Sequence, residues 1–199
     1  MAIKFQYNKT SLQTLDKQLK VRRKTLPTLK NKESALRVEV KRAKDDATKL
    51  DEELQEALKK FDVMSRLWDE FEPSLIRIKD VQLSSKKIAG IVTPILDNII
   101  FEIAPYNIFN NPVWFADGIA VLKYLSETAL KREVYIRKME LLDYARKKTT
   151  QKVNLYEKVQ IPGFEDAIIK IKRFLEDEEN LSKSAQKIVK TRQLQEAIS

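Results

Sequence analysis

A heptad repeat of apolar residues over the first third of the chain constrains the fold more than any other feature. Sixteen of the eighteen a and d positions are apolar, and Arg22 and Glu33 are the exceptions. The a positions are Leu12, Leu19, Leu26, Glu33, Val40, Ala47, Leu54, Phe61 and Trp68, and the d positions are Leu15, Arg22, Leu29, Leu36, Ala43, Leu50, Ala57, Met64 and Phe71. One frame held over nine heptads is typical of a left-handed coiled coil. The pattern predicts a helix of about sixty residues, roughly 90 Å long.

Pro27 lies inside this predicted helix. Proline has no amide hydrogen to donate to the carbonyl of Arg23, and its ring crowds that turn, so a bend is expected there. Because the heptad frame passes through Pro27 unchanged, we expect one bent helix rather than two separate helices.

Composition supports long helices and argues against an enzyme. The chain has only three glycines, few for a fold with many turns. It has no cysteine and no histidine, which excludes thiolate metal sites, cysteine nucleophiles and histidine acid–base catalysis. No phosphate-binding glycine motif is present. We therefore expect no catalytic residues, no cofactor and no metal.

The sequence indicates no membrane insertion. The N-terminus lacks the apolar core of a signal peptide. The most apolar stretch, Ile95–Ile103, is interrupted by Asp97, Asn98 and Glu102, and is too short to cross a bilayer. We expect a soluble, cytoplasmic protein.

The positive charge gathers at both ends of the chain. The net charge is +9, and residues 1–50 hold fourteen Lys or Arg against five Asp or Glu. Residues 181–199 hold four against one, so the middle of the chain is slightly acidic.

An insert of different composition follows from Pro73. Residues 73–116 contain seven charged side chains and four of the six prolines. Val81 and Leu83 alternate with polar residues, and Ile88–Val92 follows around Gly90, which predicts a short β-hairpin. Ile99, Phe101 and Ile103 alternate next, before a loop rich in Pro and Asn.

A second long helix is predicted from Pro112-Val113-Trp114 onward, interrupted at Pro162 and weakening beyond Glu178. Its apolar positions are Leu122, Leu125, Ala129, Ile136, Met139, Leu142, Ala145, Ile161, Phe164, Ile168, Ile171 and Leu175. The predicted fold is mainly α-helical: a long antiparallel two-helix coiled coil with a small insert that contains a short β-hairpin. Its parts are residues 1–72, 73–113 and 114–199, with both basic termini at one end and the aromatic residues at the other.

Several segments of the sequence match the pattern of one protein family. They are the runs from Asn8 to Leu12 and from Leu29 to Leu36, the segment Lys148-Thr149-Thr150-Gln151-Lys152-Val153-Asn154 with Glu157 and Ile161-Pro162, the segment Ile88-Ala89-Gly90-Ile91 with Pro94, and Asn111-Pro112-Val113-Trp114. In this order they resemble the N-terminal helix, the C-terminal signature, the hairpin and the start of the second long helix of the D subunit of V-type and archaeal-type ATPases. The resemblance covers nearly the whole chain, and Pro27 departs from it.

The resemblance implies a central rotor shaft of a rotary ATPase, coupling ATP hydrolysis or synthesis to proton or sodium transport. It implies three partners: the hexameric ring of catalytic A and B subunits, the small F subunit, and the funnel-shaped subunit of the membrane rotor. It also implies a place on the membrane-bound complex without insertion into the membrane, and no site for nucleic acid.

Three sets of residues are candidate contacts on this basis. Contact with the stator ring is predicted for Lys17, Lys20, Arg22, Arg23 and Lys24, contact with the F subunit for Val81, Leu83, Ile88 and Ile91, and docking at the base for Trp68, Phe71, Trp114 and Phe115. Simpler alternatives stay open: the basic run is a solvated face, and the aromatic residues only close the base of the coil. Glu33 either pairs with a basic residue of the opposing helix or is exposed by the bend.

Other classes of protein share some of these features. A basic coiled coil suits a nucleic-acid-binding protein or a scaffold, but a basic DNA-binding arm lacks an apolar seam and here the heptads continue through the basic segment. A membrane-curving helical bundle would carry its positive charge along one long face, whereas here the charge is expected to gather at one end. An inert structural spacer would show the same heptads, but it would not need the apolar, proline-rich insert that begins at Pro73.

Overall fold

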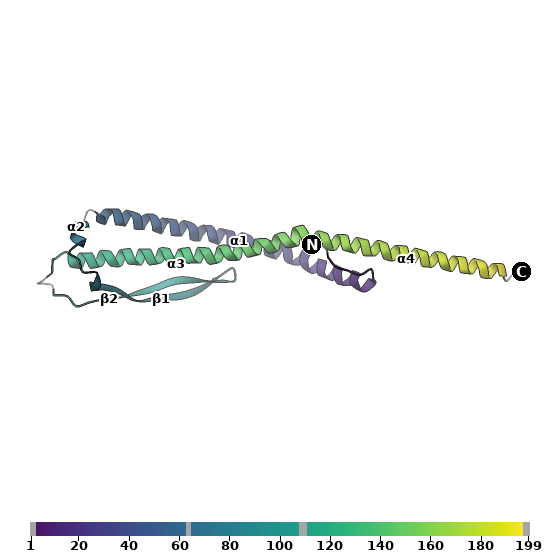
Figure 1. Ribbon diagram of the computed structural model, residues 1–199, viewed down its shortest axis with the longest axis horizontal. Coiled ribbons are helices and arrows are strands. Elements are labelled where there is room, and N and C mark those ends of the chain that lie inside the picture. The colour runs from purple at the N-terminus through teal and green to yellow at the C-terminus, as the bar shows by residue number, and fades with distance from the viewer. Residues whose placement is uncertain (1–2, 63–64, 108–110, 197–199) are drawn as a thin grey trace. The chain divides into compact units, whose positions relative to one another are not determined.

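The computed structural model of the 199-residue chain describes residues 3–62, 65–107 and 111–196. In chain order the elements are helix α1 (Lys9–Asp62), helix α2 (Ser65–Trp68), a 3₁₀ turn (Pro73–Leu75), strand β1 (Ile76–Ile88), strand β2 (Ile91–Ile103), helix α3 (Phe115–Asn154), a π-helical turn (Leu155–Gln160) and helix α4 (Ile161–Glu196). Figure 1 shows these elements. The predicted fold class, mainly helical with a β-hairpin between two long helical stretches, is confirmed.

The heptad pattern predicts the buried side of α1 correctly. Every a and d position from Leu12 to Phe61 is buried or half-buried. Pro27 lies inside α1, so the prediction of one continuous helix is confirmed, whereas the bend there stays a prediction. The predicted extension of this helix to Phe71 is wrong, because α1 ends at Asp62 and α2 is a separate short helix. Met64 lies outside the described residues.

The chain forms two compact units. Unit 1 comprises residues 1–31 and 149–199, and unit 2 comprises residues 32–148. Both α1 and α3 therefore contribute to both units. The three parts expected from the sequence, residues 1–72, 73–113 and 114–199, follow the order of elements along the chain and stay a prediction.

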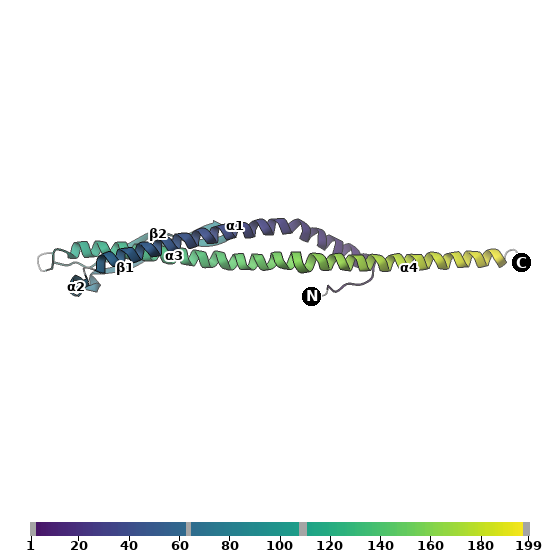
Figure 2. The same cartoon turned by 90° about the horizontal axis from the view of Figure 1, so that it is seen from above.

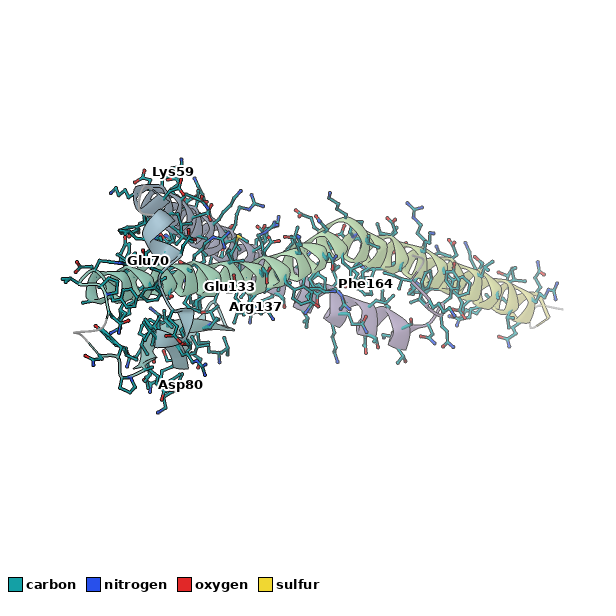
Figure 3. All side chains as sticks on the ribbon, turned by 60° about the vertical axis from the view of Figure 1, so that its left-hand side comes forward. Lys59, Glu70, Asp80, Glu133, Arg137 and Phe164 are labelled. Carbon is teal, nitrogen blue, oxygen red and sulfur yellow. The ribbon has the colours of Figure 1, made fainter. Side chains whose placement is uncertain are left out.

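Unit 1 is an antiparallel helix pair with its own apolar core. Leu15 and Leu19 of α1 are buried against a set of α4 residues. That set is Phe164, Ala167, Ile168 and Ile171, and Phe164 is labelled in Figure 3. The segment before α1 folds back onto α4: the rings of Tyr7 and Phe174 lie 4.9 Å apart. The Asn8 side chain then accepts a 2.7 Å hydrogen bond from the Ser11 amide, which caps the start of α1.

Unit 2 contains the second half of α1 paired with α3. Arg132 forms a 2.6 Å ion pair with Asp51, and the Tyr124 hydroxyl donates a 2.7 Å hydrogen bond to Glu53. Higher numbers on α1 thus meet lower numbers on α3, which makes the pair antiparallel. The hydrogen bond to Glu53, with smaller contributions from desolvation and the Glu53 charge, raises the pKa of the Tyr124 hydroxyl.

The β-hairpin of unit 2 is longer than predicted. β1 and β2 are antiparallel over thirteen residues each, from the pair Ile76–Ile103 at the base to the pair Ile88–Ile91 at the turn. The two alternating stretches that the sequence suggested separately therefore belong to one ribbon. Figure 1 and Figure 2 show this ribbon running along α3.

A two-residue turn closes the hairpin. Ala89 and Gly90 both have positive φ, 48° and 84°, which is the pattern of a type I′ turn. A β-carbon at Gly90 would lie 3.7 Å from the Lys32 ammonium nitrogen, an ordinary contact distance. Space is therefore available at Gly90, and only the backbone conformation requires glycine.

We expect the Gly90→Ala variant to destabilise the hairpin by about 1 kcal/mol, since a left-handed backbone is costly for a residue with a β-carbon. Amide hydrogen exchange of β1 and β2 measures this local opening. Ala89→Asn is the matched control and is expected to slow exchange slightly, because asparagine tolerates positive φ better than alanine. Equal exchange in Gly90→Ala and the unchanged chain would contradict the assigned turn.

Pro162 does not interrupt the second long helix as the sequence analysis predicted. Instead, a π-helical turn precedes it, in which the Ile161 amide donates to the carbonyl of Tyr156, five residues back. In a regular α-helix Pro162 would leave the Lys158 carbonyl without its donor and crowd it. The wider turn relieves this conflict, and α4 then begins at Ile161 with Pro162 in its first turn.

The last part of α4 is exposed on every side. Every residue from Glu176 to Gln195 is exposed, including Leu181 and Leu194. Within unit 1, α1 begins beside the Ile168–Leu175 part of α4, and α4 continues beyond it (Figure 1 and Figure 2). Both basic ends of the chain belong to unit 1, and about five turns of α4 extend past the start of α1.

Candidate interaction surfaces

The basic cluster near the start of α1 divides into two groups. Arg22 and Arg23 contact the opposing helical segment, whereas Lys17, Lys20 and Lys24 are exposed. The Arg23 guanidinium forms a 2.5 Å ion pair with Glu165 of α4. Lys20 is bridged to Asp16 of its own helix at 2.8 Å. The Arg23 side chain is itself 61% exposed, and contact of the basic cluster with a partner stays a prediction.

Arg22 occupies a d position and is half-buried there. Its Nε donates a 2.6 Å hydrogen bond to the Gln160 side chain, and one terminal nitrogen lies 3.3 Å from the Gln18 carbonyl. The guanidinium carbon lies 4.6 Å from the centre of the Phe164 ring and 5.7 Å from that of Tyr156. Arginine suits this position because its charged plane stacks on aromatic rings while its edge donates hydrogen bonds. The contacts give Arg22 an internal role in the coiled coil.

Glu33, the other polar residue in the heptad frame, is mostly buried. Its side chain is 13% exposed and forms a 2.8 Å ion pair with Arg37, one turn further along α1. This pairing compensates a carboxylate that would otherwise be costly to bury. The predicted pairing with a basic residue of the opposing helix stays a prediction.

The four predicted contacts on the hairpin do not share one environment. Leu83 is 55% exposed, whereas Val81, Ile88 and Ile91 are half-buried. Ile88 lines a groove between the hairpin and the helices of unit 2. Leu83 is therefore the member of this set with the most surface available to a partner, and Val92 on β2, at the end of the predicted hairpin segment, is also exposed.

The groove has a volume of about 390 Å³ and is lined by residues of α1, β1, β2 and α3. From α3 it takes four residues at helical spacing, which places them on one face: Lys131, Val134, Tyr135 and Lys138. Thr93 at its floor is fully buried and donates a 2.9 Å hydrogen bond to the Lys86 carbonyl. The groove combines an apolar wall with basic side chains.

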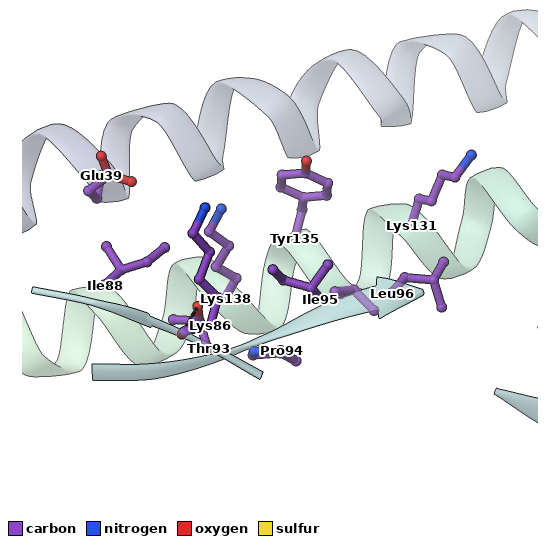
Figure 4. Close-up of a pocket in the computed structure, with 11 residues that line it drawn as sticks. Glu39, Lys86, Ile88, Thr93, Pro94, Ile95, Leu96, Lys131, Tyr135 and Lys138 are labelled. Atoms are coloured by element: carbon purple, nitrogen blue, oxygen red, sulfur yellow. Dashed lines mark hydrogen bonds between the residues drawn. The ribbon is translucent and has the colours of Figure 1, made fainter. Parts of the chain in front are cut away.

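Figure 4 shows how these basic side chains lie. Lys86 from the hairpin and Lys138 from α3 run side by side and point toward α1. The Lys138 ammonium lies 5.1 Å from the centre of the Tyr135 ring, and Lys131 is bridged to Glu127 at 2.6 Å. Glu39 of α1 also lines the groove, so the lining carries both basic and acidic side chains. Sequence alone gave no sign of this groove, because it arises from four separate elements.

The four aromatic residues of the predicted base are brought together. Trp68, Phe71, Trp114 and Phe115 form neighbouring ring pairs with centres 5.1–5.7 Å apart. Phe71 and Phe115 are buried together with Leu75 and Ile119. A β-carbon at Gly118 would lie 2.9 Å from the Trp114 ring, so only glycine fits there. Their packing role is clear, and docking of a partner stays a prediction.

The sequence pattern of one protein family matches this chain over residues 11–191, and the family is described as the D subunit of ATP synthase. The chain belongs to the ATP synthase D-subunit family. The match spans α1, the hairpin, α3 and most of α4, so the D-subunit resemblance noted in the sequence is confirmed across both units.

Named relatives of the family agree with this assignment. The V-type ATP synthase D subunit of Borreliella burgdorferi is 30% identical over 190 residues, which cover 94% of each chain. The protein of the same name in Chlamydia pneumoniae is 29% identical over 184 residues, 89% of this chain and 87% of that protein. That of Chlamydia abortus is 26% identical over 157 residues, 76% of each.

The helices of this D-subunit family member are rich in charged residues. In the part of the chain that the structure describes, none is both long and apolar enough to cross a bilayer.

Proposed function

We propose that this chain is the central rotor shaft of a V-type rotary ATPase. In that role it couples ATP hydrolysis or synthesis in a ring of A and B subunits to ion transport, and contributes no catalytic residue. The observation that carries the proposal is the unbroken heptad face of α1, buried against antiparallel helices in both units of a D-subunit family member. A long buried seam of this kind resists shear between the two helices.

The proposed mechanism is conformational coupling. A single asymmetric shaft inside a ring of threefold symmetry contacts three equivalent sites in three different ways. Each orientation then stabilises a different set of site conformations, and by linkage each set favours one orientation. Rotation and hydrolysis become coupled without any covalent step on the shaft.

The surfaces of the chain suggest where each partner would bind. The exposed Lys17, Lys20, Arg23 and Lys24, with the half-buried Arg22 beside them, would face the ring, and so would the exposed end of α4. The hairpin, with Leu83 outward and the basic groove beside it, suits the small F subunit. The aromatic end around Trp114, next to the 94% exposed Val113, suits the funnel-shaped subunit of the membrane rotor. These contacts would hold the chain at the membrane as a peripheral subunit in the cytoplasm.

Reconstitution tests the proposal directly. The purified chain is mixed with the A, B and F subunits of its own complex, and the products are sized by chromatography with light scattering. We expect one shaft and one F subunit per ring, and ATPase activity that depends on the shaft. Self-association of the chain without binding to the ring would contradict the proposal.

Charge reversal adds a site-specific arm to the same experiment. Lys17→Glu with Lys24→Glu is expected to weaken ring binding, with a larger effect at low ionic strength because these charges are exposed. Lys59→Glu with Lys60→Glu, at the far end of α1, is the matched control for net charge. Equal ring binding by both double variants would show that the basic cluster does not contact the ring.

The basic ends of the chain also suit a nucleic-acid-binding protein. The buried heptad seam argues against this alternative, since Leu15 and Leu19 pack within the chain and Arg22 is engaged by Gln160. A salt-sensitive gel shift with DNA or RNA would favour it.

A further inference from the structure

The segment before α1 is extended and packs along α4. Ile3 and Phe5 are half-buried against the core of unit 1, whereas Lys4 and Gln6 are exposed. This alternation is that of an extended chain with one side packed. Figure 1 and Figure 2 both show the segment running back along α4 from the start of α1. We call residues 3–7 the N-terminal staple.

Both ends of the N-terminal staple contact α4. Ile3 lies against Gly163, and the Tyr7 ring lies 4.9 Å from the Phe174 ring. Between these ends the Phe5 ring packs edge-on against Tyr7, with the ring centres 5.4 Å apart. An extended chain from Ile3 to Tyr7 spans roughly 13 Å, and the helix from Gly163 to Phe174 spans about 16 Å. The staple therefore runs parallel to α4 at nearly its full length.

The missing side chain of Gly163 leaves a notch that admits the staple. Gly163 lies in a helix and does not have a positive φ, so its conformation does not require glycine. Glycine inside a helix is less favourable than alanine by about 1 kcal/mol. A β-carbon at this position would lie 3.0 Å from Cδ1 of Ile3, closer than an ordinary contact. Space for Ile3 therefore explains the glycine.

The other end of the staple is fixed to the start of α1. The Asn8 amide donates a 2.9 Å hydrogen bond to the Gln6 carbonyl, and the Asn8 side chain caps α1 through the Ser11 amide. The Gln6 amide donates a further hydrogen bond, 3.4 Å long, to the Ser11 hydroxyl oxygen. These bonds join the staple to the first turn of α1. Movement of α1 along α4 therefore has to draw Ile3 out of the notch.

We propose that the N-terminal staple prevents α1 from sliding along α4, with Ile3 in the Gly163 notch as its anchor. A helix end is where a packed pair opens first, and α1 has no acidic residue in its first turn to stabilise that end. The step to function rests on the rotor role proposed above. Torque shears the two helices of a shaft against each other, so the staple bears load at the start of α1. Coupling of ATP hydrolysis to ion transport then depends on it.

Amide hydrogen exchange on the full-length chain tests the staple without a partner. Phe5→Ala is expected to make exchange in the first turns of α1, residues 9–15, about tenfold faster, because apolar contact between the staple and the core is lost. Lys4→Ala is the matched control and should leave this exchange unchanged, since Lys4 is exposed. Equal exchange in the two variants would show that the staple does not hold α1.

A pair of substitutions tests the notch. Gly163→Ala would stabilise an isolated helix, yet here it is expected to speed exchange in residues 9–15, because the added methyl group displaces Ile3. Adding Ile3→Val removes Cδ1 and should restore slow exchange. Unchanged or slower exchange in Gly163→Ala alone, or no recovery on adding Ile3→Val, would overturn the notch as the anchor.

Reconstitution of the whole membrane-bound complex in vesicles tests the torsional role. We expect Phe5→Ala to join the ring and hydrolyse ATP as the Lys4→Ala control does, but to transport at least about twofold fewer ions per ATP. Normal transport per ATP by an assembled Phe5→Ala complex would overturn the torsional role. Failure of the unchanged chain to join the ring would overturn the rotor proposal and the torsional role with it, and the exchange results would still decide whether the staple holds α1.

Discussion

Replacing Ile171 by alanine is expected to destabilise unit 1 by about 2–5 kcal/mol. Ile171 is fully buried and packs in the core formed by Leu15, Leu19 and Phe164. Truncation leaves a cavity that a two-helix pair has few neighbours to fill. Since a whole domain is stable by only about 5–15 kcal/mol, the loss should expose much of the pair to exchange.

Urea unfolding followed by circular dichroism measures this loss, and amide exchange assigns it to unit 1. Ile169→Ala provides a matched control on the same helix, because Ile169 is 47% exposed. Its effect should stay within about 0.5 kcal/mol. Similar losses for both variants would mean that α4 is not packed through the face described here.

Replacing Phe115 by alanine is expected to cost about 3–5 kcal/mol in unit 2. Phe115 is 3% exposed, and its ring centre lies 5.2 Å from that of Phe71 and 5.1 Å from that of Trp114. The ring connects the start of α3 to the segment between α2 and the hairpin. Its removal should therefore loosen both ends of the insert.

Tryptophan fluorescence reports this change directly, because the chain has two tryptophans and both belong to this cluster. A red-shifted emission and an earlier urea transition are the expected results. Val113→Ala, two residues away, is the control, since Val113 is almost fully exposed and its truncation should change neither signal. An unchanged emission in Phe115→Ala would show that the aromatic cluster is not a packed core.

The heptad frame of α1 was predictable because coiled-coil burial depends only on the spacing of apolar residues. Leu15, Leu36 and Ala43 needed no knowledge of the partner helix to be assigned to the buried face. The end of α1 was not predictable in this way, since Trp68 and Phe71 continue the spacing after the helix has ended. There the tertiary aromatic cluster, and not the coil, determines their position.

The hairpin was found but underestimated. Its far strand includes Pro94, and its turn begins with Ala89, a residue that rarely adopts positive φ. Pro94 and Ala89 both make the sequence pattern less typical of a long β-hairpin. The cross-strand pairs that extend it, such as Ile76 with Ile103, are separated by too many residues for a local pattern to reveal.

For the candidate site residues, too, local patterns were predictable from the sequence and tertiary contacts were not. The sequence located the basic cluster and the aromatic base, but not which side chains are available to a partner. Arg22 faces the interior because Tyr156 and Phe164 lie opposite it. Their placement depends on one extra residue in the second long helical stretch, since the buried Thr149 and Phe164 are fifteen residues apart, which is two heptads and one residue. Comparing the frames of Leu142 and Ile171 along the sequence would have revealed the extra residue.

The exposed end of α4 has a thermodynamic consequence for the free chain. An isolated helix of about twenty residues is marginal in water, and an exposed ion pair such as Lys183 with Glu179, at 2.6 Å, adds only a few tenths of a kcal/mol. This segment should therefore fluctuate between helix and coil until a partner surface covers Leu181, Ile188 and Leu194. The helicity of this end of α4 then reports how much of the chain has bound a partner. Part of the binding free energy is used to order the helix, so changes that stabilise the free helix should also raise the affinity for the partner.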